Sequence, residues 1–169
     1  MDTQVREAAV LESAFETFYQ RWFPSVARSM ALVVQDVESG KEIAQDGFRK
    51  AWERWPRLSS PDHARNFVFQ VSLNEARSLL RHRRRARLLR SDRSDTVADV
   101  AGGTTDRIAV FHALAALTSR ERECVVLVDY LGYDSGAAAK IVGTRPSTVR
   151  VQLARGRAKL RDLLGESDD

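Results

Sequence analysis

Hydrophobic residues recur at the spacing of an α-helix through most of this chain, and the alternation typical of β-strands is scarce. A first helical run is expected from about Val5 to Trp22. Pro24 then predicts a kink or a restart, before a second run that continues to about Val34. The front of the chain is therefore expected to be helical.

Capping residues and prolines predict where the next two helices begin and end. Residues 39–42, Ser-Gly-Lys-Glu, have the spacing of a capping box and predict the start of a helix that Pro56 ends. After a loop over residues 57–61, Asp62 is the expected cap of a further helix, which runs into an arginine-rich segment. Its apolar positions are Phe67, Val71, Leu73 and Leu80.

The periodic pattern fails between about Leu89 and Thr105, where Ser, Asp, Thr and a Gly-Gly pair dominate. We interpret residues 89–105 as a flexible linker, with a long ordered surface loop as the alternative. The linker divides the chain into a domain of residues 1–88 and a domain of residues 106–169.

The second domain has the turn signals of a helix-turn-helix. Residues 118–121, Thr-Ser-Arg-Glu, form a second capping box before a helix that reaches about Tyr130. After Gly132, Asp134 is expected to cap a short helix over residues 135–142. Gly143 then predicts a turn, and Pro146 suits the first position of the last helix. The expected fold class is therefore all-α: two small helical domains joined by a flexible linker, the C-terminal one containing a helix-turn-helix.

The last predicted helix has two different faces. One face is apolar and is expected to pack on the preceding helices through Val149, Leu153, Gly156, Leu160 and Leu163. The other is small and basic, and the chain has no acid between Thr144 and Arg161. Small residues let a backbone approach a DNA groove, and arginines reach phosphates or guanine edges. This pattern favours DNA reading over a merely solvated basic helix.

Charge along the chain indicates two different partners. The net charge is only +4, from 27 Lys and Arg against 23 Asp and Glu. Acids nevertheless predominate in the first 48 residues, whereas residues 77–93 hold eight arginines and a single acid. A polyanion suits the basic segment. Glu42 and Asp46, spaced i and i+4 on the acidic helix, form either a solvated face or the dock of a basic protein partner.

Aromatic residues near the arginines leave two interpretations open. Trp52, Phe67 and Phe69 are either core residues or a platform on which unstacked single-stranded bases could stack.

Several classes of function are not expected. Cys124 is the single cysteine, so neither an internal disulfide nor a thiolate metal cluster can form, and its apolar surroundings predict burial. The three histidines lack metal-ligand spacing, and no phosphate loop or nucleophile motif is present. No catalysis, metal or cofactor is therefore expected. No signal pattern or membrane-length apolar run occurs, which predicts a cytoplasmic protein without membrane insertion.

Two stretches of the sequence resemble the bacterial RNA polymerase sigma factors of the extracytoplasmic-function (ECF) group. QDVESGKEIAQDGFRKAWERWPRL and NFVFQVSLNEARSLLRHRRR together resemble the sigma domain that binds the polymerase clamp and the minus-ten element. ALAALTSRERECVVLVDYLGYDSGAAAKIVGTRPSTVRVQLARGRAKLR resembles the domain that reads the minus-thirty-five element. The resemblance implies a sigma factor that binds core RNA polymerase and directs promoter recognition, DNA melting and transcription initiation.

The resemblance also implies roles for particular residues and partners. Core polymerase would be bound by Glu42, Gln45 and Asp46. The melted non-template strand at the minus-ten element would be bound by Arg57, Ser60, His63, Arg65, Asn74, Arg77 and Arg81. The minus-thirty-five duplex would be bound by Arg145, Ser147, Thr148, Arg150, Val151 and Arg155. Further implications are an anti-sigma protein that clamps the two domains, and a place in the bacterial cytoplasm in association with the nucleoid.

Departures from the family pattern fall on specificity positions, which leaves the promoter sequence open. Phe67 stands where a tryptophan is usual, Ser78 where an acid is usual, and Arg145 where a serine is usual. A free-standing helix-turn-helix regulator that acts without polymerase remains the alternative function. That alternative predicts binding of duplex DNA by the isolated chain, commonly as a dimer.

Overall fold

The computed structural model describes residues 2–89 and 105–165, and every regular element in those ranges is helical. The elements are α1 (Asp2–Val34), α2 (Val37–Arg54), a 3-10 turn η1 (Trp55–Arg57), α3 (Pro61–Leu89), α4 (Thr105–Ala115), α5 (Ser119–Val125), a π-helical turn η2 (Val126–Tyr130), α6 (Ser135–Val142) and α7 (Pro146–Leu164). The predicted all-α class is confirmed. The interior of the predicted linker lies outside the described residues, so its character and the exact domain limits stay predictions.

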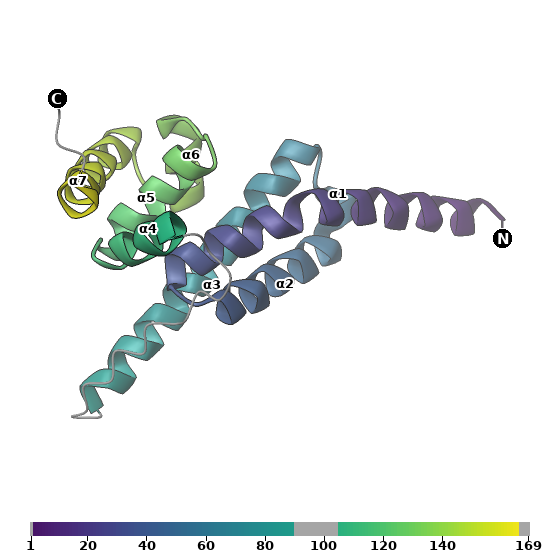
Figure 1. The fold of residues 1–169 in the computed structure, drawn as a ribbon. Coiled ribbons are helices and arrows are strands. Elements are labelled where there is room, and N and C mark those ends of the chain that lie inside the picture. Colours follow the sequence, from purple (N-terminus) through teal and green to yellow (C-terminus); the bar gives the residue numbers. More distant parts are fainter. Residues whose placement is uncertain (1, 90–104, 166–169) are drawn as a thin grey trace.

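Helices α1, α2 and α3 pack side by side as the N-terminal domain (Figure 1). Their shared core includes Met30, Phe48, Val68, Phe69 and Leu73, each almost completely buried. Of the three ambiguous aromatics, Phe69 is core, Phe67 is half-buried beneath the Arg54 guanidinium, and Trp52 is 42% exposed. The core interpretation is therefore confirmed for Phe69, while Trp52 lies at the surface against Phe15.

Of the two outcomes predicted at Pro24, a kink or a restart, the restart is wrong, because the first helix continues through the proline. The run from Asp2 to Val34 is one helix with Pro24 inside it. A proline removes one backbone hydrogen bond, but packing on both sides can keep the chain helical. Here Phe23, before the proline, packs against the Phe48 ring, and Val26, after it, is completely buried.

The predicted starts of α2 and α3 were wrong by a few residues. The N-cap of α2 is Asp36, whose carboxylate accepts the Ser39 N–H, so Ser39 lies inside the helix. At α3 the Ser60 hydroxyl accepts the His63 N–H, and Asp62 lies in the first turn. Both segments offer two capping side chains a few residues apart, and local spacing alone does not choose between them.

Tertiary contacts support the Asp36 cap. The Arg83 guanidinium of α3 donates to the Asp36 carboxylate at 3.1 Å, to the Ser39 hydroxyl at 2.8 Å and to the Val34 carbonyl at 3.3 Å. Burial opposes ionisation of Asp36, but the bonds from Ser39 and the charge of Arg83 outweigh it and lower the pKa of this carboxyl. Arg83 therefore ties the α1–α2 turn to α3.

The turn chemistry predicted for the C-terminal domain is confirmed. Thr118 and Glu121 form a reciprocal capping box at the start of α5, and Asp134 caps α6. Gly143 has a φ of 76°, the left-handed conformation that ends α6, and Pro146 is the first residue of α7. The buried face of α7 consists of Val149, Leu153 and Gly156 with the half-buried Leu160; Leu163 is 54% exposed, so the predicted apolar face ends one turn early.

The C-terminal helices lie against the middle of the N-terminal domain (Figure 1). The N-terminal part of α1 and the C-terminal end of α3 project away from this junction in different directions. Cys124 is buried as predicted, and burial raises the pKa of its thiol to about 11, so the thiol stays protonated and unreactive. None of the described helices is both long and apolar enough to cross a membrane.

The close packing of α2 against α1 at Ala31 depends on Gly40. A Cβ atom at Gly40 would lie 2.4 Å from the backbone nitrogen of Ala31, which is far inside van der Waals contact. Because backbone atoms cannot give way as side chains do, Gly40→Ala should force the two helices apart and lower the free energy of unfolding by about 3 kcal/mol. Urea unfolding followed by circular dichroism measures this change.

Gly136→Ala is the matched control, because a Cβ there would meet only the Asp134 carboxylate, at 3.1 Å, within α6. It should leave stability unchanged or raise it by up to about 1 kcal/mol. Equal stability of the two variants would contradict the proposed close packing.

Candidate nucleic-acid interface

The predicted duplex-reading residues lie together on the exposed N-terminal half of α7. All six are exposed, with Val151 at 49%, while Val149 and Leu153 hold the opposite side of the helix in the core. These six residues are Arg145, Ser147, Thr148, Arg150, Val151 and Arg155. The structure therefore places the predicted set on one accessible basic surface.

Ion pairs divide the basic residues of α7 into two groups. Arg157 forms a two-bond pair with Asp129, which raises the pKa of its guanidinium, and the Lys159 ammonium lies 2.7 Å from a Glu121 oxygen. Within the described residues, Arg150 and Arg155 have no acidic partner. The C-terminal half of α7 thus fastens the helix to α5 and η2, and the N-terminal half keeps its positive charge available.

The predicted polymerase-docking residues share the outer face of α2. Glu42, Gln45 and Asp46 are exposed at i, i+3 and i+4, opposite the buried residues of the same helix. Asp46 lies 3.5 Å from Arg49, which also bonds Glu53. The acidic face predicted from the sequence is therefore an accessible surface of a firmly packed helix.

The residues predicted to hold single-stranded DNA are divided by the structure. Arg57, Ser60, His63, Asn74 and Arg81 are exposed along the η1–α3 loop and α3. Within this group Ser60 caps α3, and the Ser59 hydroxyl lies 3.1 Å from the His63 ring. Arg65 and Arg77 differ, because both point into the junction with the C-terminal domain.

Arg77 is bound on several sides by the C-terminal domain, and its side chain is only 16% exposed. Its guanidinium donates to the two Glu123 carboxylate oxygens at 2.9 and 2.7 Å and to the Val142 carbonyl at 2.9 Å. Glu123 is 1% exposed and also accepts from Arg120 at 3.2 Å.

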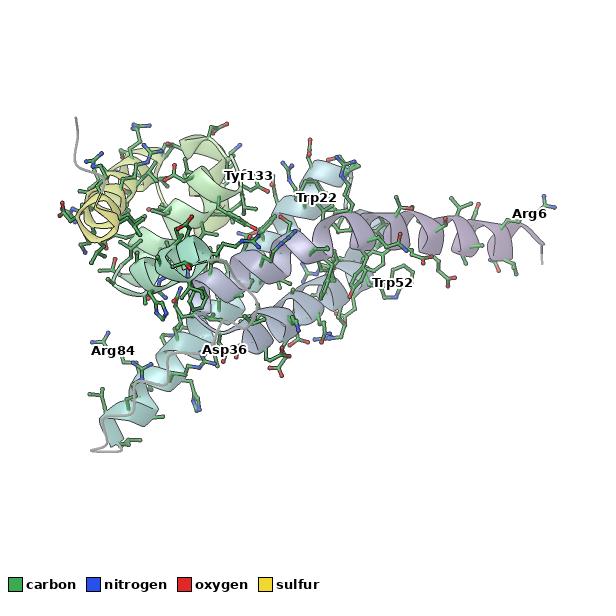
Figure 2. The ribbon with its side chains drawn as sticks, viewed as in Figure 1. Arg6, Trp22, Asp36, Trp52, Arg84 and Tyr133 are labelled. Atoms are coloured by element: carbon green, nitrogen blue, oxygen red, sulfur yellow. The ribbon has the colours of Figure 1, made fainter. Side chains whose placement is uncertain are left out.

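Arg65 lies between two aromatic rings that come from different domains. The guanidinium carbon is 5.0 Å from the ring centre of Trp22 in α1 and 5.1 Å from that of Tyr133, which precedes α6. These distances are those of cation–π contacts. Trp22 and Tyr133 are labelled on the two sides of the junction in Figure 2. The Tyr133 hydroxyl donates to Asn66 at 3.3 Å.

Arg122 is a residue at this junction that the sequence reasoning missed. Its buried guanidinium donates to the carbonyls of Val33, Leu114, Ala115 and Leu117, at 2.7 to 3.2 Å. Val33 lies at the C-terminal end of α1, and Leu114 and Ala115 lie at that of α4, where the helix dipoles are negative; Leu117 lies in the turn after α4. Burial lowers the pKa of Arg122, against the opposing influence of Glu123, but a guanidinium remains charged. An arginine within a charged run, Ser-Arg-Glu-Arg-Glu, gives no local signal of such burial.

Replacing Arg122 should destabilise the C-terminal domain and its junction. Arg122→Gln removes most of the donors and leaves buried carbonyl groups without partners, so we expect a loss of about 2–4 kcal/mol in the free energy of unfolding. Urea unfolding followed by circular dichroism measures it. Arg120→Gln is the control, because that side chain is 54% exposed, and it should cost less than about 1 kcal/mol. Similar midpoints for the two variants would contradict the role of Arg122.

Comparison with known proteins finds two regions of the sigma-70 family in this chain. Residues 18–86 match the family model of sigma-70 region 2, and residues 107–160 match that of sigma-70 region 4. The first match covers most of the N-terminal helices, and the second covers the helix-turn-helix.

Relatives of known sequence indicate to which group of sigma factors the chain is similar. The chain is 32% identical over 161 residues to the ECF RNA polymerase sigma factor SigC of Mycobacterium tuberculosis, covering 92% of this chain and 85% of that protein. It is 30% identical over 142 residues to the probable RNA polymerase sigma factor RfaY of Xanthomonas campestris; the match covers 78% of this chain but only 36% of that longer protein.

Solved structures share the fold. CnrH in complex with the cytosolic domain of CnrY superposes with a TM-score of 0.68 at 26% identity, covering 93% of this chain and 91% of that one. The sigma factor RpoE in complex with the anti-sigma factor NepR, from Bartonella quintana, superposes with a TM-score of 0.78 at 22% identity, covering 92% of this chain and 99% of that one. This chain belongs to the ECF group of RNA polymerase sigma factors. Its function is promoter recognition together with RNA polymerase. These comparisons do not favour the alternative of a free-standing helix-turn-helix regulator.

Proposed function

We propose that the three exposed residue sets divide promoter recognition among them. Glu42, Gln45 and Asp46 on α2 dock on core polymerase, and the basic half of α7 holds the minus-thirty-five duplex. The η1–α3 loop and α3 hold the melted non-template strand at the minus-ten element. The observation that carries the proposal is α7: its exposed face presents Arg150, Val151 and Arg155, for which the described part of the chain holds no acidic partner, while its other face is packed in the core.

The chemistry of α7 fits duplex binding. Arginine side chains can bond phosphates or the O6 and N7 atoms of guanine, and a valine between them suits a thymine methyl group. The ion pairs of Arg157 and Lys159 fix the rotation of α7 on its own domain. Such a fixed helix presents its contact residues without a large loss of side-chain and backbone freedom on binding.

The chemistry of the η1–α3 loop and α3 fits an unpaired strand. Arg57, His63 and Arg81 supply positive charge to a backbone, and Ser60 and Asn74 offer polar groups to base edges. Trapping the opened strand in this way would favour strand separation without catalysis by the chain itself. Bond formation would belong to the polymerase.

An anti-sigma protein is a further proposed partner, with action in the bacterial cytoplasm and at the nucleoid. CnrH, which shares 26% identity and the two-domain fold, was solved in complex with the cytosolic domain of CnrY. The comparable arrangement of domains in this chain supports a regulator that binds both domains.

Removing the free arginines of α7 should weaken promoter-dependent transcription. With core polymerase and a promoter selected from a random upstream library, Arg150→Ala and Arg155→Ala should each lower transcript yield about tenfold, because each removes a base or phosphate contact. Arg157→Ala is the matched control on the same helix, since the Arg157 guanidinium is engaged by Asp129. The Lys159–Glu121 ion pair and the buried Val149 and Leu153 still hold α7 in that variant, which should retain most of the yield. No promoter-dependent transcript with the unaltered chain would refute the proposed function.

Reversing the charge of the α2 face should weaken docking on polymerase. The double variant Glu42→Lys and Asp46→Lys should bind fluorescently labelled core polymerase at least about tenfold more weakly, because two favourable charge contacts become repulsive. Glu12→Lys on the exposed part of α1 makes the same type of change elsewhere and should bind as the unaltered chain does. Equal binding by all three proteins would exclude this face of α2 as the dock.

A further inference from the structure

One face of α3 carries a row of exposed polar side chains with one phenylalanine ring among them. The exposed members, at the spacing of successive helical turns, are His63, Gln70, Asn74, Ser78 and Arg81. Phe67 lies half-buried in the same row. An unpaired strand that followed this row from the η1–α3 loop to Arg81 would therefore pass over Phe67.

The Phe67 ring is covered by an arginine of α2. The Arg54 guanidinium carbon lies 5.6 Å from the ring centre, within the range of a cation–π contact, and Arg54 itself is exposed. Arg54 is the last residue of α2, which packs tightly on α3: a Cβ atom at Gly47 would overlap the Ser72 hydroxyl oxygen. The packing of two helices therefore fixes where Arg54 meets the row on α3.

The charge of Arg54 is not neutralised in the part of the chain that the structure describes. Its sequence neighbour Glu53 bonds Arg49 instead, at 2.6 Å. Within residues 4–89 and 105–165, no carboxylate forms an ion pair with Arg54. Arg54 thus combines a fixed position with a charge that remains available to a ligand.

A guanidinium held over an aromatic ring suits an unstacked base. Proteins that bind single strands stack bases on aromatic rings and on the planes of arginine side chains. Phe67 alone is half-buried and has no hydrogen-bond donor, whereas Arg54 adds an exposed plane, a positive charge and N–H groups that donate to phosphate. Purines offer the larger stacking surface, so a purine fits this platform better than a pyrimidine does.

We propose that Arg54 is a further single-strand contact of this sigma factor, and that its guanidinium plane, held over Phe67, stacks on one unpaired purine of the opened strand. The inference rests on the proposed function of α3. It deepens that function by adding a residue of α2 and by giving the class of ligand. Arg54 contacts the base directly, and Phe67 acts through Arg54 by holding the guanidinium in place.

Binding of an unpaired strand by the chain in complex with core polymerase tests the proposal. Fluorescence anisotropy measures the affinity for a labelled non-template-strand oligonucleotide that spans the minus-ten element of the selected promoter. Arg54→Ala should bind it about tenfold more weakly, because one base loses its stacking partner. Arg54→Lys keeps the charge but not the plane and should recover less than about half of that loss. Arg28→Ala, which removes an exposed arginine of α1, should bind as the unaltered chain does.

Oligonucleotides with one abasic nucleotide separate a base contact from a phosphate contact. Each position of the element is made abasic in turn. At one position the unaltered chain should lose about tenfold in affinity and Arg54→Ala should lose little more, because the base that Arg54 would stack on is already absent. At that position the unaltered chain should also prefer a purine to a pyrimidine. If Arg54→Ala caused the same loss with every abasic oligonucleotide, Arg54 would contact only the backbone and the proposal would be wrong.

Variants of Phe67 show whether the ring and the guanidinium act as one platform. Indole is broader than phenyl and has its own N–H donor, so Phe67→Trp added to Arg54→Ala should restore affinity to within about threefold of the unaltered chain. Phe67→Leu alone should weaken binding, because Arg54 loses its cation–π contact. Unchanged binding in both cases would contradict the shared platform. If either variant lost its helical circular dichroism, the Arg54 variants and the abasic series would decide alone.

The inference and the proposed function fail in different ways. If core polymerase with the unaltered chain bound the minus-ten oligonucleotide no better than a scrambled one, the proposed function of α3 would fail, and the inference with it. If it bound the minus-ten oligonucleotide better but Arg54→Ala bound equally well, the function would stand and the inference would be overturned. Because Arg54 shares α2 with the proposed dock, binding of labelled core polymerase is measured for each variant, and Arg54→Ala should bind it normally.

Discussion

The junction of the two domains depends on the burial of one arginine. Within its own domain Arg122 donates to the last carbonyls of α4 and to one in the turn that follows, and it reaches the Val33 carbonyl near the end of α1 in the other domain. A buried charge is tolerated when its hydrogen-bonding capacity is used, and here the negative ends of two helices also face it. Because Glu123 follows directly in the sequence and bonds Arg77, the same turn of α5 carries two of the polar contacts that orient the domains.

The sequence was sufficient for features that local chemistry determines. Helical periodicity predicted the fold class, and Thr118, Asp134, Gly143 and Pro146 predicted the boundaries of the helix-turn-helix because each has a steric or hydrogen-bonding reason for its place. The exposed face of α7 was predicted from the positions of its residues around the helix axis. The starts of α2 and α3 did not follow, since two nearby polar residues could each have served as the cap of either helix. At α2 the choice involved Arg83, more than forty residues away, which bonds both Asp36 and Ser39.

Long-range pairing explains what the sequence could not predict about the site. Arg77 and Arg81 stand in the same basic segment, yet Arg77 is covered by Glu123 while Arg81 is exposed. Arg122 lies among charged residues that all read as solvated, and only the approach of α1 makes it a buried bridge. Tyr133 gave no signal at all, because its contacts with Arg65 and Asn66 exist only once the domains meet. Each of these residues acquires its role from a neighbour distant in the chain.

The bonds of Arg83 divide the arginine block at the end of α3 into two kinds of charge. Arg83 donates hydrogen bonds to Asp36, Ser39 and the Val34 carbonyl, so its charge is neutralised within the protein. Arg81, Arg84, Arg85 and Arg87 remain exposed around it, with Arg84 on the projecting end of the helix (Figure 2). Counterions are released from DNA only by cations that reach its phosphates. The ionic-strength dependence of DNA binding through this segment would therefore reflect its exposed arginines, while Arg83 would contribute to it only by holding the helix in place.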